Sequence, residues 1–286
     1  MLGYVHILIS AFFFCLMTVF VKLAGQDIST IQIVFVRGVF TLVVTYAIIV
    51  YHKVAPLGQN RNLLMARGIT GTVALFLVYE SIQRFPLPEA TVIQYLYPIF
   101  TALLASIILS EKLTKMIFAA IILGLLGVYI TLDFPFLIKT TVQYQDTIIA
   151  LSGAFLTGLA YVMVRKANNL KESPYVIMFY FPLFTVPLSL VLMGNNWVDP
   201  NTEIWIYLFL VGLTSQLGQM FLTFGYRLLP ASRASITSYV QVPLSVVAGI
   251  FIFNHSISIN FILGSVIIFF AIKIVFDKAN KLILEN

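Results

Sequence analysis

The chain has 286 residues, of which 60% are hydrophobic and 10% charged, and its mean hydropathy is +0.99. Soluble proteins carry about 25% charged residues, so this composition excludes a soluble globular protein and predicts an integral membrane protein. The net charge of +6 comes without a basic block, which argues against a nucleic-acid partner, and the single cysteine, Cys15, excludes a disulfide framework or a CxxC site.

Runs of about 20 apolar residues, separated by Pro, Gly, Asn and charged residues, predict ten membrane-spanning helices. In the first half they cover residues 3–25, 30–51, 62–84, 88–110 and 113–132, and in the second half residues 145–167, 174–194, 202–227, 231–253 and 257–277. The connections are short, and the longest, residues 133–144, joins the two halves. We therefore expect an all-α membrane protein without a soluble domain.

The distribution of Lys and Arg predicts the orientation, because cytoplasmic loops carry an excess of these residues. An even number of spans places both termini on one side of the membrane. If that side is cytoplasmic, Arg37 lies inside the second span and the outer flanks hold only Lys22, Arg84 and Lys139. All other Lys and Arg residues then fall on the inner side. We expect both termini in the cytoplasm, and a retained first span rather than a cleaved signal peptide, because no basic segment precedes it.

Two stretches of the chain repeat the same order of features. Residues 79–112 contain a proline break, Pro98 within an apolar run and a charged exit, and residues 226–255 repeat this order around Pro243. Residues 10–24 also align without gaps on residues 153–167. Because each half has an odd number of spans, the second half is inserted upside down relative to the first. This predicts two inverted five-helix repeats, residues 1–135 and 136–286, around a central cavity, a plan common among secondary transporters.

Three features carry a resemblance to a known family. They are the five-plus-five plan, Arg37 within FVRGVFTLVV, and the stretch YESIQRFPLPEATVIQYLYPIFTALLASIILSEKLT, which ends the third span and crosses the fourth. Together they resemble the EamA family of the drug/metabolite transporter superfamily. The resemblance implies that spans one to four and six to nine surround the cavity, with spans five and ten outside it. It also implies transport of amino acids or related small metabolites, often outward across the bacterial inner membrane.

The chain departs from the family pattern at two positions. Glu80 stands where a small apolar residue is usual in the family. In the second repeat, His255 takes the place that Glu111 has in the first, so the second repeat lacks this glutamate. The departure at Glu80 bears on the substrate that the family would imply.

Arg37 and Glu80 are the charged candidates for function. An arginine well inside a span costs about 2.5 to 3.5 kcal/mol on insertion scales, so it normally faces a polar interior. Glu80 lies near the outer end of the third span, at a depth where the two side chains could meet. They would form either a charged outer gate that binds a substrate carboxylate or a fixed ion pair between two spans. Glu80 is also a candidate proton-coupling carboxylate.

Helical spacing places further polar and aromatic residues on shared faces, most clearly Gln216 and Gln219 in the eighth span. The candidate substrate-binding residues are Arg37, Glu80, Gln94, Tyr97, Tyr161, Tyr180, Gln216, Gln219 and Tyr239. Such residues suit an apolar pocket with a few placed hydrogen-bonding groups, and the alternative is that each one bonds a neighbouring helix. Pro98 and Pro243 are candidate hinges or static kinks, because a proline inside a helix removes a backbone hydrogen bond.

The motifs of several enzyme classes are absent from the sequence. It contains no GxxxxGK[ST] or HExxH motif and its acidic residues are scattered, so we expect neither an enzyme nor a bound cofactor or metal. The sequence predicts a secondary transporter that exports small metabolites such as amino acids by alternating access, as a monomer or homodimer. The alternatives are import of another metabolite, such as a nucleoside- or adenosyl-type solute, a non-transporting membrane scaffold or sensor, and a passive channel.

Overall fold

The computed structural model describes residues 1–85, 87–134, 143–253 and 258–284, and all regular structure in these ranges is helical. The first half contains α1 (Leu2–Ala24), α2 (Thr30–Tyr51), α3 (Arg61–Arg84), α4 (Leu87–Gln94), α5 (Tyr97–Ile108) and α6 (Lys115–Thr131). The second half contains α7 (Tyr144–Asn169), α8 (Pro174–Met193), α9 (Thr202–Leu228), α10 (Ala231–Thr237), the 3₁₀ turn η1 (Ser238–Val240), α11 (Gln241–Phe253) and α12 (Ile259–Leu284).

The predicted all-α membrane fold is confirmed. Within the described ranges, nine segments are long and apolar enough to cross a bilayer, and α6 adds an apolar helix of 17 residues. A helix of that length is close to the shortest that spans the hydrocarbon core. The predicted repeat boundary between residues 135 and 136, the middle of the connecting loop, and His255 lie outside the described residues.

Several helices begin where a polar side chain caps the first turn. Ser29 accepts a hydrogen bond from the backbone N–H of Gln32 at 3.2 Å, and Asn201 accepts one from Ile204 at 2.9 Å. These side chains satisfy backbone donors that have no partner inside the helix. The short polar connections therefore set where α2 and α9 begin.

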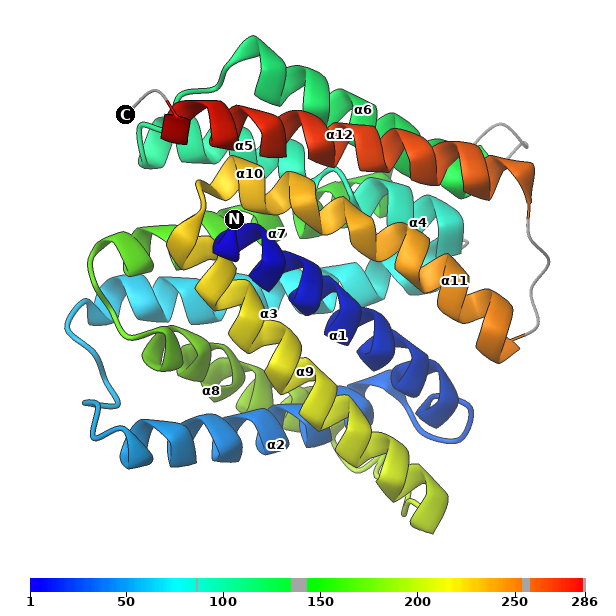
Figure 1. Ribbon diagram of the computed structural model, residues 1–286. Coiled ribbons are helices and arrows are strands. Elements are labelled where there is room, and N and C mark those ends of the chain that lie inside the picture. Colours follow the sequence, from blue (N-terminus) through cyan, green and yellow to red (C-terminus); the bar gives the residue numbers. More distant parts are fainter. Residues whose placement is uncertain (86, 135–142, 254–257, 285–286) are drawn as a thin grey trace.

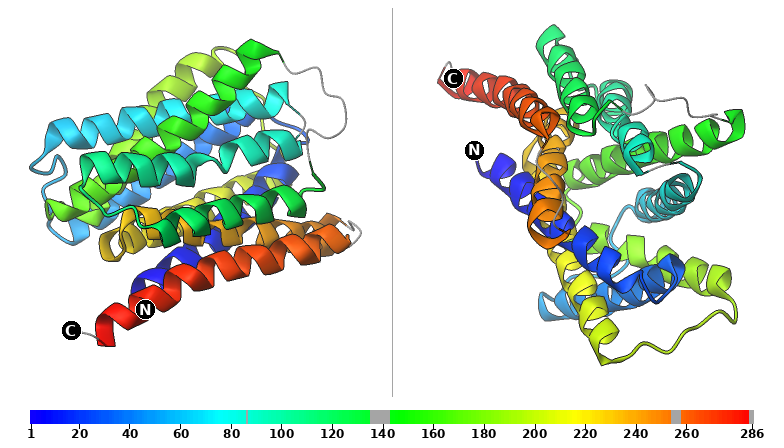
Figure 2. Two further views of the ribbon diagram at one scale, coloured as in Figure 1. Left: turned by 90° about the horizontal axis from the view of Figure 1, so that it is seen from above. Right: turned by 90° about the vertical axis from the view of Figure 1, so that its right-hand side faces the viewer.

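The two halves pack in matching pairs, as an inverted repeat requires. Helix α1 packs against α9, and its counterpart α7 packs against α3. In the same way α2 packs on α8, α5 on α7, and α1 on α11. Helices α6 and α12 pack on each other, and they lie together on one side of the remaining helices (Figure 2). The two five-helix repeats are thus interleaved rather than separate bodies.

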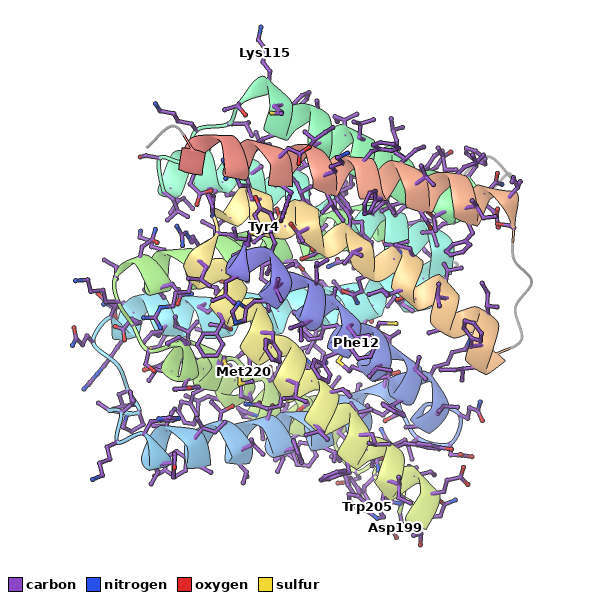
Figure 3. The ribbon with its side chains drawn as sticks, in the orientation of Figure 1. Tyr4, Phe12, Lys115, Asp199, Trp205 and Met220 are labelled. Atoms are coloured by element: carbon purple, nitrogen blue, oxygen red, sulfur yellow. The ribbon has the colours of Figure 1, made fainter. Side chains whose placement is uncertain are left out.

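The start of α1, the connection between α2 and α3, and the end of α12 lie toward the same end of the bundle, on the left in Figure 1. We call this the N-terminal end. Asp199 and Trp205, near the start of α9, lie at the opposite end (Figure 3). Both described termini of the helical bundle therefore share one side, as an even number of spans requires.

Polar clamps join the two repeats at both ends. At the N-terminal end, the buried carboxylate of Glu172 accepts hydrogen bonds from the backbone N–H groups of Gln59, at 2.9 Å, and Asn60. At the opposite end, the Gln32 side chain donates to the carbonyl of Val198 at 2.6 Å and accepts from its N–H at 3.1 Å. Each clamp ties a connection of one repeat to the other repeat.

The fourth and ninth spans differ from the prediction, because neither is one continuous helix. The fourth is divided into α4 and α5, and the ninth into α10, η1 and α11. Pro98 lies in the first turn of α5 and Pro243 in the first turn of α11. A proline is tolerated there because its missing N–H would have no helical partner. Pro98 therefore lies just after the turn at Tyr95 and Leu96 that separates α4 from α5, and Pro243 lies just after the 3₁₀ turn that joins α10 directly to α11.

The two breaks meet inside the protein. The rings of Tyr95 and Tyr239 stack with centroids 5.9 Å apart, and the Tyr239 hydroxyl donates to the carbonyl of Tyr95 at 3.3 Å. This bond satisfies a backbone acceptor at the break, as burial in a membrane requires. The ring of Tyr239 also packs on Gly124 of α6, where a side chain would overlap it. Each break is thus positioned by the opposite repeat.

Gly68 sets the close approach of α3 to α8. A Cβ atom at this position would lie 2.5 Å from the carbonyl oxygen of Tyr180 and 2.6 Å from Cδ2 of Phe184. We expect Gly68→Ala to lower the free energy of unfolding by about 1–3 kcal/mol, because backbone cannot move aside easily. Thermal unfolding of the purified protein in detergent measures this loss.

Gly153→Ala is the matched control, because the nearest atoms to its added Cβ would lie at 3.3 Å. We expect a clearly smaller loss for this variant. Equal stability of the two variants would contradict the close packing of α3 on α8.

Candidate functional site

A small cavity lies between α2, α8 and α9, which belong to both repeats. Its volume is about 10 Å³, room for about one water molecule. The lining residues are Arg37, Thr41, Thr45, Met178, Phe181, Pro182, Ser215, Gln216 and Gln219. The cavity wall therefore combines apolar and polar side chains, carries one positive charge, and has no carboxylate among these lining residues.

The α9 wall supplies the two predicted glutamines. Gln216 is buried, and its side chain donates to the hydroxyl of Thr45 in α2 at 3.0 Å. Both residues line the cavity. Gln219 donates to the Thr223 hydroxyl at 3.5 Å. The hydroxyl oxygen of Ser215 is buried without a hydrogen-bond partner in the described structure. This wall thus holds one polar group that is free to bind a ligand.

The α8 wall is shaped by a proline inside the helix. Pro182 has no N–H, so it leaves the carbonyl of Met178 without its helical donor, and both residues line the cavity. Phe181 is the residue before Pro182, and its backbone carbonyl accepts hydrogen bonds from the hydroxyls of Thr185, at 2.9 Å, and Thr72, at 3.4 Å. The Thr72 contact holds α8 at this point to α3.

Two arginines contact the same aromatic ring. The guanidinium carbon of Arg37 lies 6.0 Å from the ring centroid of Phe181, and that of Arg67 lies 5.2 Å from it. Arg37 also donates to the sulfur of Met17 at 3.6 Å. Neither arginine forms an ion pair with a carboxylate of the described residues. No carboxylate of the described residues therefore balances these two positive charges, and Tyr161 is a further polar residue that interacts electrostatically with both arginines.

Of the two arginines, Arg67 is the more deeply buried. Its side chain is 3% exposed, and its Nε and Nη1 atoms have no hydrogen-bond partner in the described structure. The guanidinium group fits beside α3 because Gly71 has no side chain there to overlap Nη1. A cation–π contact contributes about 2 kcal/mol when desolvated. Removing one partner of a buried ion pair costs about 3–5 kcal/mol, so the ring alone does not offset an unpaired buried charge.

Sequence reasoning missed Arg67, because it was counted with the charges that flank the inner end of the third span. The signal was present in the sequence. Arg67 lies inside residues 62–84, about one and a half helical turns from the start. The cost argument that selected Arg37 applies equally to it.

The structure does not form the predicted contact between Arg37 and Glu80. The Glu80 carboxylate instead binds Arg84, one turn away on the same helix, at 2.6 Å. Arg84 also binds Asp146 at the start of α7, at 2.8 Å. Glu80 and Arg84 are both more than one third exposed. Glu80 therefore belongs to an exposed network that joins α3 to α7, and it does not line the cavity.

A group of aromatic residues lies between the break in the fourth span and α7. Tyr161 contacts Tyr97 with ring centroids 5.4 Å apart, and Tyr226 at 5.2 Å. Gln94 donates to the Thr157 hydroxyl at 3.3 Å, while its own carbonyl oxygen is buried without a partner. Tyr97, Tyr161 and Gln94 are thus brought together, but none of them lines the cavity.

Tyr180 and Tyr239 also lie away from the cavity. The Tyr180 hydroxyl donates to the carbonyl of Leu57 at 3.0 Å, which fastens the connection before α3 to α8. Tyr239 is fully buried against Tyr95 at the helix breaks. Each of these two side chains therefore bonds a neighbouring segment of the protein, which was the alternative to substrate binding.

A third ion pair, between Glu111 and Arg165, lies at the N-terminal end. Glu111 accepts from the backbone N–H of Ala231 at 3.0 Å, and Nε of Arg165 lies 3.6 Å from the same carboxylate. Arg165 donates to the carbonyls of Tyr226, at 3.0 Å, and Arg227, at 2.7 Å. This network ties the turn between α9 and α10 to the end of α5 and to α7. The described residues contain no group of three His, Cys, Asp or Glu side chains that could hold a metal ion.

Known proteins match almost the whole chain. The model of the EamA-like transporter family matches residues 1–133 and 147–276. The pseudopaline exporter CntI of Pseudomonas aeruginosa is 26% identical over 241 residues, 84% of this chain and 84% of the relative. Human solute carrier family 35 member G1 is 28% identical, covering 89% of this chain and 73% of that protein. The S-adenosylmethionine uptake transporter of Rickettsia prowazekii is 24% identical, covering 86% and 83%.

A solved crystal structure has the same fold, with a TM-score of 0.81 at 16% sequence identity. The superposition covers 98% of this chain and 97% of the other. The matched relatives are transporters rather than enzymes. The helices, the interleaved repeats and the match to the family model agree, and the chain belongs to the EamA-like transporter family.

Proposed function

We propose that this integral membrane protein is a secondary transporter that exports small metabolites, such as amino acids, by alternating access. The observation that carries the proposal is the cavity between α2, α8 and α9, which has room for about one water molecule. A metabolite can enter such a space only if the helices move apart. The family and the named exporter among the relatives support transport in the outward direction.

The helix breaks and the clamps supply the moving parts of the proposed cycle. The repeats, residues 1–135 and 136–286, rock against each other, while the breaks beside Pro98 and Pro243 absorb the bending. The Glu172 clamp opens when the N-terminal end opens, and the Gln32 clamp opens when the opposite end does. Broken helices at a repeat interface are a recurrent feature of secondary transporters.

We place both termini in the cytoplasm and the protein in a bacterial inner membrane, as a monomer or homodimer. The excess of Lys and Arg at the N-terminal end supports this orientation. Import is the competing direction, because one relative is an S-adenosylmethionine uptake transporter. The arginine on the cavity wall, without a carboxylate among the lining residues, supports a solute without net positive charge in either direction of transport.

Solute flux in proteoliposomes tests the function directly. We expect the purified protein to carry a labelled amino acid from a mixed pool into vesicles, faster when they contain the unlabelled solute. Counterflow of this kind requires a carrier, since a passive channel has no such stimulation. Absence of flux for every labelled metabolite would favour a scaffold or sensor instead.

Locking either end with a cross-link tests alternating access. We expect cysteines at Gln59→Cys and Glu172→Cys, in a Cys15→Ala background, to abolish flux on oxidation and to regain it on reduction. The same result is expected for Gln32→Cys with Val198→Cys, because each end must open in turn. Each single-cysteine variant is the control. Flux that persists after complete cross-linking at both ends would contradict the mechanism.

Glu80 is the residue to test for proton coupling. Its ion pair with Arg84 at an exposed end supports a fixed structural role. We therefore expect Glu80→Gln to leave the pH dependence of flux unchanged, with Asp146→Asn, which removes the other partner of Arg84, as the matched variant. A pH profile that flattens only in Glu80→Gln would show that this carboxylate carries the coupled proton.

A further inference from the structure

We propose that Arg67 and Arg37 together form the binding site for a carboxylate of the transported solute, with the ring of Phe181 between them. This inference rests on the proposed transport function and names the substrate class as organic acids. It assigns a role to Arg67, which lies outside the cavity lining in the present conformation. The carboxylate would supply the charge partner that both arginines lack.

The first support is the bonding state of Arg67. Its side chain is 3% exposed, and its Nε and Nη1 donors are buried without partners in the described structure. A guanidinium group presents its donors in a planar fork that matches the two oxygens of a carboxylate. Nε and Nη1 lie on different edges of the guanidinium group, so each of them offers a separate single hydrogen bond to a carboxylate oxygen. Ser215 offers a further unbonded hydroxyl on the cavity wall.

The second support is that the two arginines reach the ring from opposite ends of the membrane. Arg67 lies about two turns into α3, which begins at the N-terminal end, and Arg37 lies about two turns into α2, which begins at the opposite end. Both guanidinium groups nevertheless lie within 6.0 Å of the Phe181 ring centroid. When the Phe181 ring moves, a carboxylate released by one of these arginines is therefore close to the other arginine.

The third support is the backbone around Phe181. The ring is carried by the residue before Pro182, where α8 lacks one helical hydrogen bond. The Thr72 and Thr185 hydroxyls are 2.9 Å apart and both bond the Phe181 carbonyl, so the backbone that carries the ring is held in place. The ring lies against both guanidinium groups, so the proposed site requires the Phe181 side chain to move while its backbone stays in place.

The lining also selects against cations. Two arginines lie at the ring, and none of the residues lining the cavity is Asp or Glu. A solute with net positive charge would find neutral amide, hydroxyl and carbonyl oxygens there, beside the positive charge of Arg37. An acid, including an amino acid without net positive charge, fits this arrangement better than a cationic metabolite.

Binding of a matched acid and amide to the purified full-length protein tests the proposal. Benzoate and benzamide have nearly the same shape, and only benzoate carries the carboxylate. We expect benzoate to raise the apparent melting temperature of the wild type and benzamide to do so far less, because a ligand that binds only the folded state stabilises it. In Arg67→Gln and in Arg37→Gln, the benzoate concentration for half-maximal shift should rise by roughly tenfold or more.

Arg84→Gln is the control, because it removes an exposed arginine at the far end of α3 and should keep the wild-type response. Arg67→Lys guards against misfolding, since it retains the charge and should keep a preference for benzoate over benzamide. Equal shifts with benzoate and benzamide in the wild type would overturn the proposal, as would an unchanged preference in Arg67→Gln. These measurements need no flux, so a failure of transport and a failure of acid binding are separate results.

Discussion

The energetic cost of a guanidinium group inside a membrane protein constrains this structure more than any other single term. Insertion of one arginine at the centre of a span costs about 2.5 to 3.5 kcal/mol, and this chain brings two against the ring of Phe181. Gly71 makes room for one of them, and the hydrogen bonds of Thr72 hold the ring-bearing segment in place. The contact with the ring offsets only part of the cost. A chain that keeps two such charges without carboxylate partners in the described structure is organised for a ligand that brings the missing charge.

The inverted repeat explains how such a site becomes accessible. Each repeat contributes one broken span, and the breaks contact each other through Tyr95 and Tyr239. Each end of the bundle is joined across the repeats by a small polar clamp, at Glu172 on one side and Gln32 on the other. Hydrogen bonds of this kind contribute about 0.5–1.5 kcal/mol net, or more when a charged group takes part. Breaking one clamp while forming the contacts of a new conformation is therefore energetically accessible, which supports the proposed opening at alternate ends.

Much of the fold could be read from the sequence, because bilayer thickness and the cost of unsatisfied backbone groups leave few solutions for an apolar chain. The spans, their inverted plan and the wall positions of Arg37, Gln216 and Gln219 follow from helix length, charge distribution and helical spacing. The breaks could not be read in the same way. Pro98 has the same sequence signature whether it kinks one helix or begins a second. Glu80 and Arg84 were four residues apart, the spacing of a same-helix ion pair, so the local partner of Glu80 was readable. Arg67 was missed because charges near a span end resemble topology signals.

The central claim is that the two arginines at Phe181 bind the acidic group of the solute. A structure of the protein with a transported acid bound tests it most directly. The account predicts the carboxylate of that solute within hydrogen-bonding distance of Arg67 or Arg37, with the Phe181 side chain displaced from its present position. A bound acid whose carboxylate is held elsewhere, with both guanidinium groups still packed on the unmoved ring, would contradict it.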